Sequence, residues 1–183
     1  MDNFRIQLLT QNWIDNVSDD GKDLCSHGKV QLMINGIVLS NENSGDWTVA
    51  SSGLKLMKSA IYGYDSGIDF ELISCCGYLR MFPSCNRYIT WDTEINDNLI
   101  IISNIQCPEV DKEELKPLSG KIEIQYMEYT TQVLNFANKV IEFYSSSLPK
   151  QFYSKYEEEE YKLFWKEFNE YHQTLTEDIN KKN

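Results

Sequence analysis

Apolar side chains recur every three or four residues from Tyr129 to Tyr144, and this spacing places them on one face of an α-helix. Polar residues occupy the positions between them. Pro149 lies just beyond the pattern, where a proline ends a helix. A helix with such an apolar face needs another surface to cover it. Its apolar positions are Tyr129, Val133, Phe136, Ala137, Val140, Ile141 and Tyr144.

A second helical pattern covers about residues 156–176, and its apolar face is rich in aromatic residues. The carboxylates of residues 157–160 fall in its first turn, where they interact favourably with the helix dipole. We therefore predict a pair of helices over residues 128–177. The apolar face of the second helix comprises Tyr161, Phe164, Trp165, Phe168, Tyr171 or His172, and Leu175.

Residues 1–127 mostly show the alternation of apolar and polar positions that is typical of strands. Residues 4–8 are predicted as the first strand. The Asn35-Gly36 pair between two apolar runs predicts a hairpin, because both residues accept the positive φ that its tight turn requires. Further strands are predicted at residues 70–73, 78–82, 87–91, 99–102 and 121–126, with a turn at 96–98 and an irregular connection at 108–120.

One short helix interrupts this β-rich part, near residues 52–62. Ser51 and Ser52 are its candidate N-caps, and Gly63 is its predicted end. A sheet followed by helices predicts an α+β fold. The expected architecture is a single domain over residues 1–183, mainly an antiparallel sheet, with the short helix and two C-terminal helices packed on one face.

The charge of the chain limits the classes of partner. It has 28 acidic and 17 basic residues, a net charge of -11, which repels nucleic-acid backbones and anionic membranes and favours a basic partner. No apolar run approaches the roughly 20 residues that span a bilayer, and the first residues do not resemble a signal peptide. We therefore predict a cytoplasmic protein that binds neither nucleic acid nor membrane.

Cysteine and histidine supply the first candidate chemistry. Cys25, His27, Cys75 and Cys76 have the ligand types of a tetrahedral zinc site. Their spacing argues against such a site, because neighbouring residues on an extended chain point to opposite faces. A thiol-dependent enzyme is the related alternative, with His27 or His172 as the activating base. The simpler interpretation is that the cysteines are buried, reduced thiols without a cofactor.

Other catalytic motifs are missing from the sequence. There is no glycine-rich phosphate-binding loop, and the acidic clusters lack the register of a calcium loop. We therefore expect no cofactor. Recognition of another protein is the remaining candidate function, because acidic loops beside exposed aromatic residues suit a protein interface. The aromatic candidates, each of which could instead lie in the core, are Trp13, Trp47, Tyr62, Tyr64 and Trp91.

Several stretches of the chain carry a resemblance to known sequences: residues 23–28, 30–36, 47–57, 75–77, Trp91 and 161–165. Together they resemble small bacterial families linked to polymorphic toxin systems. The resemblance covers most of the chain and implies an immunity-type protein: a cytoplasmic inhibitor that binds one toxin without catalysis or a cofactor. The acidic charge is consistent with a basic toxin such as a nuclease.

The leading hypothesis is therefore a non-catalytic protein that neutralises a basic toxin domain. The alternatives are the Cys/His metal or thiol site, and a structural subunit that oligomerises through the aromatic face of residues 161–168. The predicted partner-binding residues lie in acidic loops and are Asp19, Asp20, Asp23, Asp65, Asp69, Asp92, Glu94 and Asp97.

Overall fold

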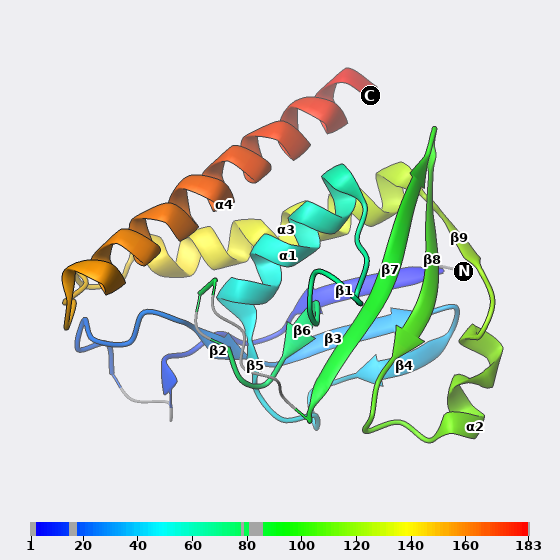
Figure 1. Ribbon diagram of the computed structural model, residues 1–183, viewed down its shortest axis with the longest axis horizontal. Coiled ribbons are helices and arrows are strands. Elements are labelled where there is room, and N and C mark those ends of the chain that lie inside the picture. The colour runs from blue at the N-terminus through cyan, green and yellow to red at the C-terminus, as the bar shows by residue number, and fades with distance from the viewer. Residues whose placement is uncertain (1–2, 15–17, 78, 81–85, 183) are drawn as a thin grey trace.

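A computed structural model describes residues 3–14, 18–77, 79–80 and 86–182 of the chain (Figure 1). Its first sheet contains β1 (Phe4–Leu8), β3 (Val30–Ile34) and β4 (Ile37–Ser40), in the order β1-β3-β4 with antiparallel pairing. Asn35 and Gly36 have φ values of 48° and 81°, so the predicted hairpin turn is confirmed. The predicted first strand is confirmed with the same bounds.

The second sheet has the order β6-β7-β8-β9. Its centre is the hairpin of β7 (Tyr88–Asn96) and β8 (Leu99–Gln106), whose turn contains Asp97 at a φ of 53°. The edges are β6 (Ile73–Ser74) and β9 (Ile122–Gln125). A short pair, β2 (His27–Gly28) with β5 (Trp47–Thr48), completes the antiparallel strands.

The larger helices lie together on one side of the strands (Figure 1). They are α1 (Val49–Tyr62), α3 (Tyr126–Ser145) and α4 (Lys155–Lys182). Helix α2 (Lys112–Leu115) and a 3-10 turn (Lys116–Leu118) occupy the connection before β9. The α+β fold with two C-terminal helices on one face is therefore confirmed.

Helix α3 occupies the centre of the core, as its apolar pattern predicts. The Tyr129 ring is fully buried, and its hydroxyl lies 2.7 Å from Ser59 Oγ on α1 and accepts a hydrogen bond of 3.2 Å from Trp91 Nε1 on β7. Burial raises the pKa of Tyr129 to about 12. One phenol thus joins both helices to the second sheet, and the buried apolar residues form one continuous cluster.

Helix α4 covers α1 and α3 with its aromatic face. Phe164 and Phe168 are fully buried, while Tyr161 and Trp165 pack partly buried against the same core. The chain itself buries Phe164 and Phe168, so these two rings are not available to an oligomer interface at residues 161–168. None of the helices in the described part of the chain is both long and apolar enough to cross a bilayer.

Some predicted boundaries are wrong. Helix α1 begins at Val49, so Ser51 and Ser52 are not N-caps and lie buried in its first turn. The predicted strand at 70–73 is reduced to Ile73–Ser74 at its end. Leu79 and Arg80 form a turn, and the rest of the predicted 78–82 strand lies outside the described residues. At Phe70 a φ of 67° takes the backbone out of the strand conformation.

Candidate functional site

The loop between α1 and β6 is attached firmly to the second sheet. Gly63, at a φ of 77°, ends α1. The next residue, Tyr64, forms a β-bridge with Thr93 of β7 through hydrogen bonds of 2.9 Å in both directions. Ser66 then donates to Asp92 Oδ1 twice, from its backbone N–H at 2.8 Å and from its hydroxyl at 2.6 Å. The chain is therefore held against β7 at two successive points.

Hydrogen bonds within the loop hold its tip. The Asp65 carbonyl accepts from the N–H groups of Ile68 at 2.9 Å and Asp69 at 2.8 Å. The Tyr64 hydroxyl donates to the Asp69 carbonyl at 2.7 Å. The buried phenol of Tyr64 has a raised pKa, mainly because burial disfavours its charged form, so it keeps the proton that it donates. The tip therefore has a defined conformation in the free protein.

Large apolar side chains at the end of α1 and on this loop are exposed to solvent. The exposed fractions are 65% for Tyr62, 75% for Ile68 and 55% for Phe70. Phe70 has a φ of 67°, which is uncommon for a bulky residue. Such strain persists where surrounding contacts impose it, and it concentrates at functional sites. We call Tyr62, Asp65, Ile68, Asp69 and Phe70 the 62–70 surface.

Carboxylates adjoin these apolar groups. Asp65 is exposed, and Asp69 forms an ion pair with Lys58 of α1. Asp92 is tied to the loop through Ser66, and Glu94, two residues along β7, is exposed and pairs with Lys121 at 3.3 Å. Four of the eight carboxylates predicted to bind a partner therefore belong to this region: Asp65, Asp69, Asp92 and Glu94.

The other predicted carboxylates lie elsewhere. Asp19 accepts backbone hydrogen bonds from Gly21 and Leu148 and pairs with Lys150 at 3.2 Å. Burial raises the pKa of Asp19, but these hydrogen bonds and the Lys150 charge outweigh it and hold that pKa below its usual value.

The remaining carboxylates of this set also have local roles. Asp20 and Asp23 accept hydrogen bonds from backbone N–H groups in the early loop, and Asp97 occupies the β7–β8 turn. The structure thus divides the predicted acidic surface between separate parts of the fold.

A small polar cavity of about 220 Å³ lies behind the 62–70 surface. Arg80 on its wall pairs with Glu167 at 3.1 Å and Glu160 at 3.5 Å, both on α4. Lys55 of α1 is almost fully buried here and donates from Nζ to the Glu71 carbonyl. Burial lowers the pKa of Lys55 to about 8. The Arg80 ion pairs therefore connect α4 to the turn after β6, and the Lys55 hydrogen bond connects α1 to the loop.

A second cavity, of about 610 Å³, lies between the outer edge of β1 and α3. Gln132 donates to the Phe4 carbonyl at 2.6 Å and accepts from the Ile6 N–H at 2.9 Å. Lys139 donates to the Leu8 carbonyl at 2.8 Å. Side chains of α3 thus form hydrogen bonds with backbone groups at the free edge of β1. These bonds protect that edge from pairing with a strand of another chain.

The structure does not assemble the candidate Cys/His site. Cys25 is buried, and burial raises the pKa of its thiol to about 11, so it is a poor nucleophile. Cys75 and Cys76 follow β6, where Cys76 is exposed and Cys75 is half-buried. Within the described residues no three His, Cys, Asp or Glu side chains come together in a way that could hold a metal ion.

The aromatic candidates are mostly core residues. Trp13, Trp47, Tyr64 and Trp91 are buried, and only Tyr62 of that set is exposed. Sequence reasoning missed Ile68 and Phe70, because the apolar run that begins at Phe70 also suits a strand. The available signal was Ile68, a large apolar residue directly after Gly67 in a polar turn.

Removing the Ser66 hydroxyl tests the anchoring of the loop. We expect Ser66→Ala to lower the free energy of unfolding by about 1 kcal/mol, because one hydrogen bond to the Asp92 carboxylate is lost. Hydrogen exchange at Ile68 and Asp69 should accelerate more than exchange in α3. Ser145→Ala, at an exposed hydroxyl of α3, should change stability by less than about 0.5 kcal/mol. Unchanged exchange at the loop would contradict the anchoring.

Comparison of the chain with protein-family models, with curated proteins and with solved structures finds no match.

Proposed function

We propose that this chain is a non-catalytic protein-binding domain, and most concretely an immunity-type protein that neutralises a basic toxin domain in the cytoplasm. The observation that carries the proposal is the 62–70 surface. There a rigid loop presents Ile68 and Phe70 to solvent beside carboxylates. Exposed apolar groups on an otherwise charged protein are typical of protein interfaces.

The rigidity of the loop favours tight binding. A partner that covers Ile68 and Phe70 gains the burial of two large apolar side chains, and the loop loses little conformational freedom because hydrogen bonds already order it. A flexible loop with the same residues would lose that entropy on binding. The strained φ of Phe70 is consistent with selection for this presentation.

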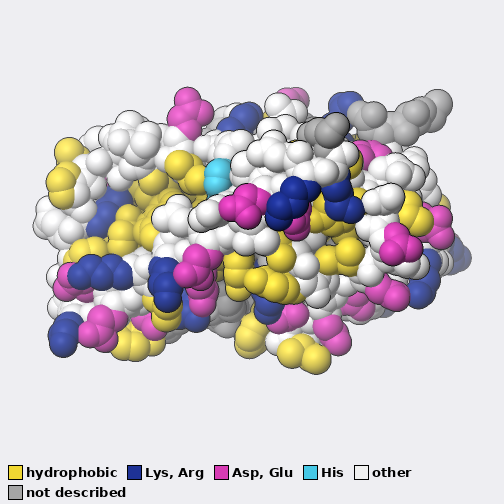
Figure 2. All heavy atoms as spheres, turned by 90° about the horizontal axis from the view of Figure 1, so that it is seen from above, with side chains coloured by type: hydrophobic (Ala, Val, Ile, Leu, Met, Phe, Trp, Pro, Cys, Tyr) yellow, Lys and Arg dark blue, Asp and Glu magenta, His cyan; other side chains and the backbone are white. Residues whose placement is uncertain are grey.

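The charge of the chain supports a basic partner. The net charge of -11 steers a basic protein toward the chain, and Asp65 and Glu94 offer exposed carboxylates near the apolar groups. The face that carries α4 is a poorer candidate. There acidic and basic side chains are interspersed (Figure 2), and pairs such as Lys162 with Glu158 and Lys166 with Glu170 partly neutralise each other.

The proposal is tested by capture and then by titration. The tagged chain is incubated with lysate of its source cells, the captured protein is identified, and its recombinant domain is titrated. We expect a basic domain bound with one-to-one stoichiometry. Ile68→Asp and Phe70→Asp should each weaken binding by at least about thirtyfold, which corresponds to about 2 kcal/mol, because each buries an unpaired charge in the interface.

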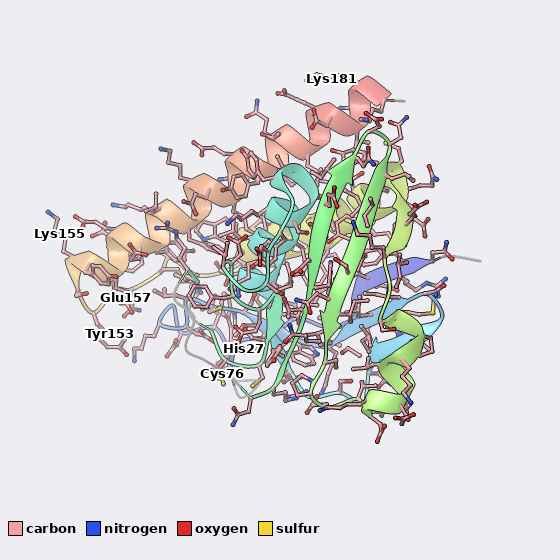
Figure 3. The ribbon with its side chains drawn as sticks, turned by 45° about the vertical axis from the view of Figure 1, so that its right-hand side comes forward. His27, Cys76, Tyr153, Lys155, Glu157 and Lys181 are labelled. Atoms are coloured by element: carbon pink, nitrogen blue, oxygen red, sulfur yellow. The ribbon has the colours of Figure 1, made fainter. Side chains whose placement is uncertain are left out.

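Control variants distinguish binding through the 62–70 surface from a general effect of an added charge. Tyr153 is 80% exposed and lies before α4 (Figure 3), so Tyr153→Asp should leave the affinity unchanged. Asp65→Lys should slow association and weaken its salt dependence. Equal affinity of both loop variants and the wild type would refute the 62–70 surface. An acidic captured domain would refute the charge argument.

Neutralisation needs its own measurement. The captured domain is expressed alone and together with the chain, and growth of the host cells is recorded. We expect growth arrest by the domain alone and growth when the wild-type chain is present, but not when Phe70→Asp is present. A captured domain that is harmless when expressed alone would refute the immunity function and leave only a binding function.

A further inference from the structure

The two adjacent cysteines that follow β6 lie close enough to react with each other. Cys75 Sγ and Cys76 Sγ are 3.4 Å apart, although neighbouring side chains on an extended strand point to opposite faces. The chain bends at these residues, and the bend brings both thiols to the same side. The sequence-based expectation that they diverge is therefore wrong.

Hydrogen bonds fix the backbone around this pair. The Cys75 N–H donates to the Arg87 carbonyl at 3.2 Å, and the Ser74 hydroxyl donates to the Cys76 carbonyl at 2.8 Å. Thr48 of β5 donates in turn to the Ser74 carbonyl at 2.7 Å. The thiols therefore stand on a defined turn that two strands support, so their proximity does not depend on chance encounters of a mobile loop.

Solvent reaches this turn. Cys76 is exposed and Cys75 is half-buried, whereas Cys25 and Cys107 are buried and burial raises the pKa of both of those thiols. Figure 3 shows Cys76 at the periphery of the molecule, on the side where His27 also lies. Among the described cysteines, Cys76 is thus the thiol most accessible to a dissolved reagent.

We propose that Cys75 and Cys76 form a redox-active dithiol that closes to a vicinal disulfide by exchange with low-molecular-weight disulfides of the glutathione class. This site does not depend on the proposed partner. Its sulfurs must approach by about 1.4 Å to reach the length of a disulfide bond.

The exchange proceeds in two balanced steps. The Cys76 thiol first loses its proton to water, and the thiolate attacks one sulfur of the oxidised reagent. This forms a mixed disulfide and releases one reagent thiolate, which takes up a proton. The Cys75 thiol then loses its proton to water, and its thiolate attacks Cys76 Sγ. This forms the bond between the two cysteines and expels the second reagent thiolate, which takes up a proton. The protein loses two hydrogens, and the reagent is reduced to two thiols.

The resulting ring makes the bond reversible. Joining neighbouring residues distorts the peptide between them, and strained disulfides are more easily reduced than relaxed ones. We therefore expect the closed form to revert rapidly when a dithiol reductant is added.

Mass spectrometry tests the proposal on the folded chain. The protein is incubated with oxidised glutathione, free thiols are alkylated, and the peptide containing residues 75 and 76 is analysed. We expect this peptide to lose two hydrogens and to carry no alkyl group. Cys75→Ser should instead retain glutathione on Cys76, because the second thiol is absent. Cys107→Ser should still close the ring as the wild type does.

Other outcomes would overturn the proposal. If wild-type Cys76 retains glutathione while Cys75 is alkylated, the second step does not occur. If both cysteines are alkylated, neither step occurs. A disulfide from either residue to Cys85, which lies outside the described residues, would assign the exchange to a different pair. Each result is read from the wild-type protein, so it does not depend on whether a variant folds.

Discussion

Truncating Phe168 to alanine is expected to lower the free energy of unfolding by about 3–5 kcal/mol, the usual cost of removing a fully buried phenylalanine ring. The ring has no exposed surface, and its centroid lies 5.2 Å from that of Trp165 and 5.6 Å from that of Phe164. It also lies over Gly53 of α1, where an added Cβ would stand 3.2 Å from the ring. Urea denaturation at neutral pH measures the loss.

This close approach explains the size of the effect. A glycine at position 53 lets α1 and α4 come together, and the ring fills the space that a side chain would otherwise occupy. Alanine would leave a cavity that the helices can only partly close. Leu163→Ala, on the solvent side of α4, serves as the control and should cost less than about 1 kcal/mol. Equal losses for both variants would contradict the docking of α4 through Phe168.

Replacing Lys55 with methionine is expected to change how stability depends on pH. The pKa of Lys55 is about 8 in the folded protein and 10.5 without burial. Below pH 8 both states hold the proton, and the folded state bears the full cost of a buried charge. Between pH 8 and 10.5 the unfolded state binds more protons, so wild-type stability rises with pH. The rise is about 1.4 kcal/mol per pH unit and about 3.5 kcal/mol in total.

The difference in the free energy of unfolding between the wild type and Lys55→Met reports the contribution of Lys55. Denaturation midpoints are measured from pH 7 to 10.5, and the free energy of the wild type minus that of Lys55→Met should increase over this range. Groups that do not interact with Lys55 cancel in the subtraction, whereas Glu71 and Cys25, whose charges act on Lys55, do not. Lys58→Met serves as the control, because it removes a partly exposed lysine of the same helix that pairs with Asp69. Parallel curves for wild type and Lys55→Met would show that Lys55 keeps an ordinary pKa.

The candidate site was only partly predictable. The predicted set includes Asp65 and Asp69, because acidic residues in turns are visible as such in a sequence, and it also includes Asp92 and Glu94 of β7. The apolar residues that give the surface its character were not identified. Phe70 begins an apolar run that suits a strand, and its exposure results from the bridge of Tyr64 to Thr93, residues 29 positions apart in the chain. Nothing local to Phe70 encodes that pairing.

The sequence by itself determined the elements whose signals are local. The alternation of β1, the Asn35-Gly36 turn and the helical spacing of α3 arise from backbone preferences and from the period of one structure type. Tertiary structure decided which aromatic rings are buried, where α1 begins and how Cys75 meets Cys76. Those features depend on contacts between distant segments, and such contacts exist only once the chain has folded, because burial is a property of the whole core.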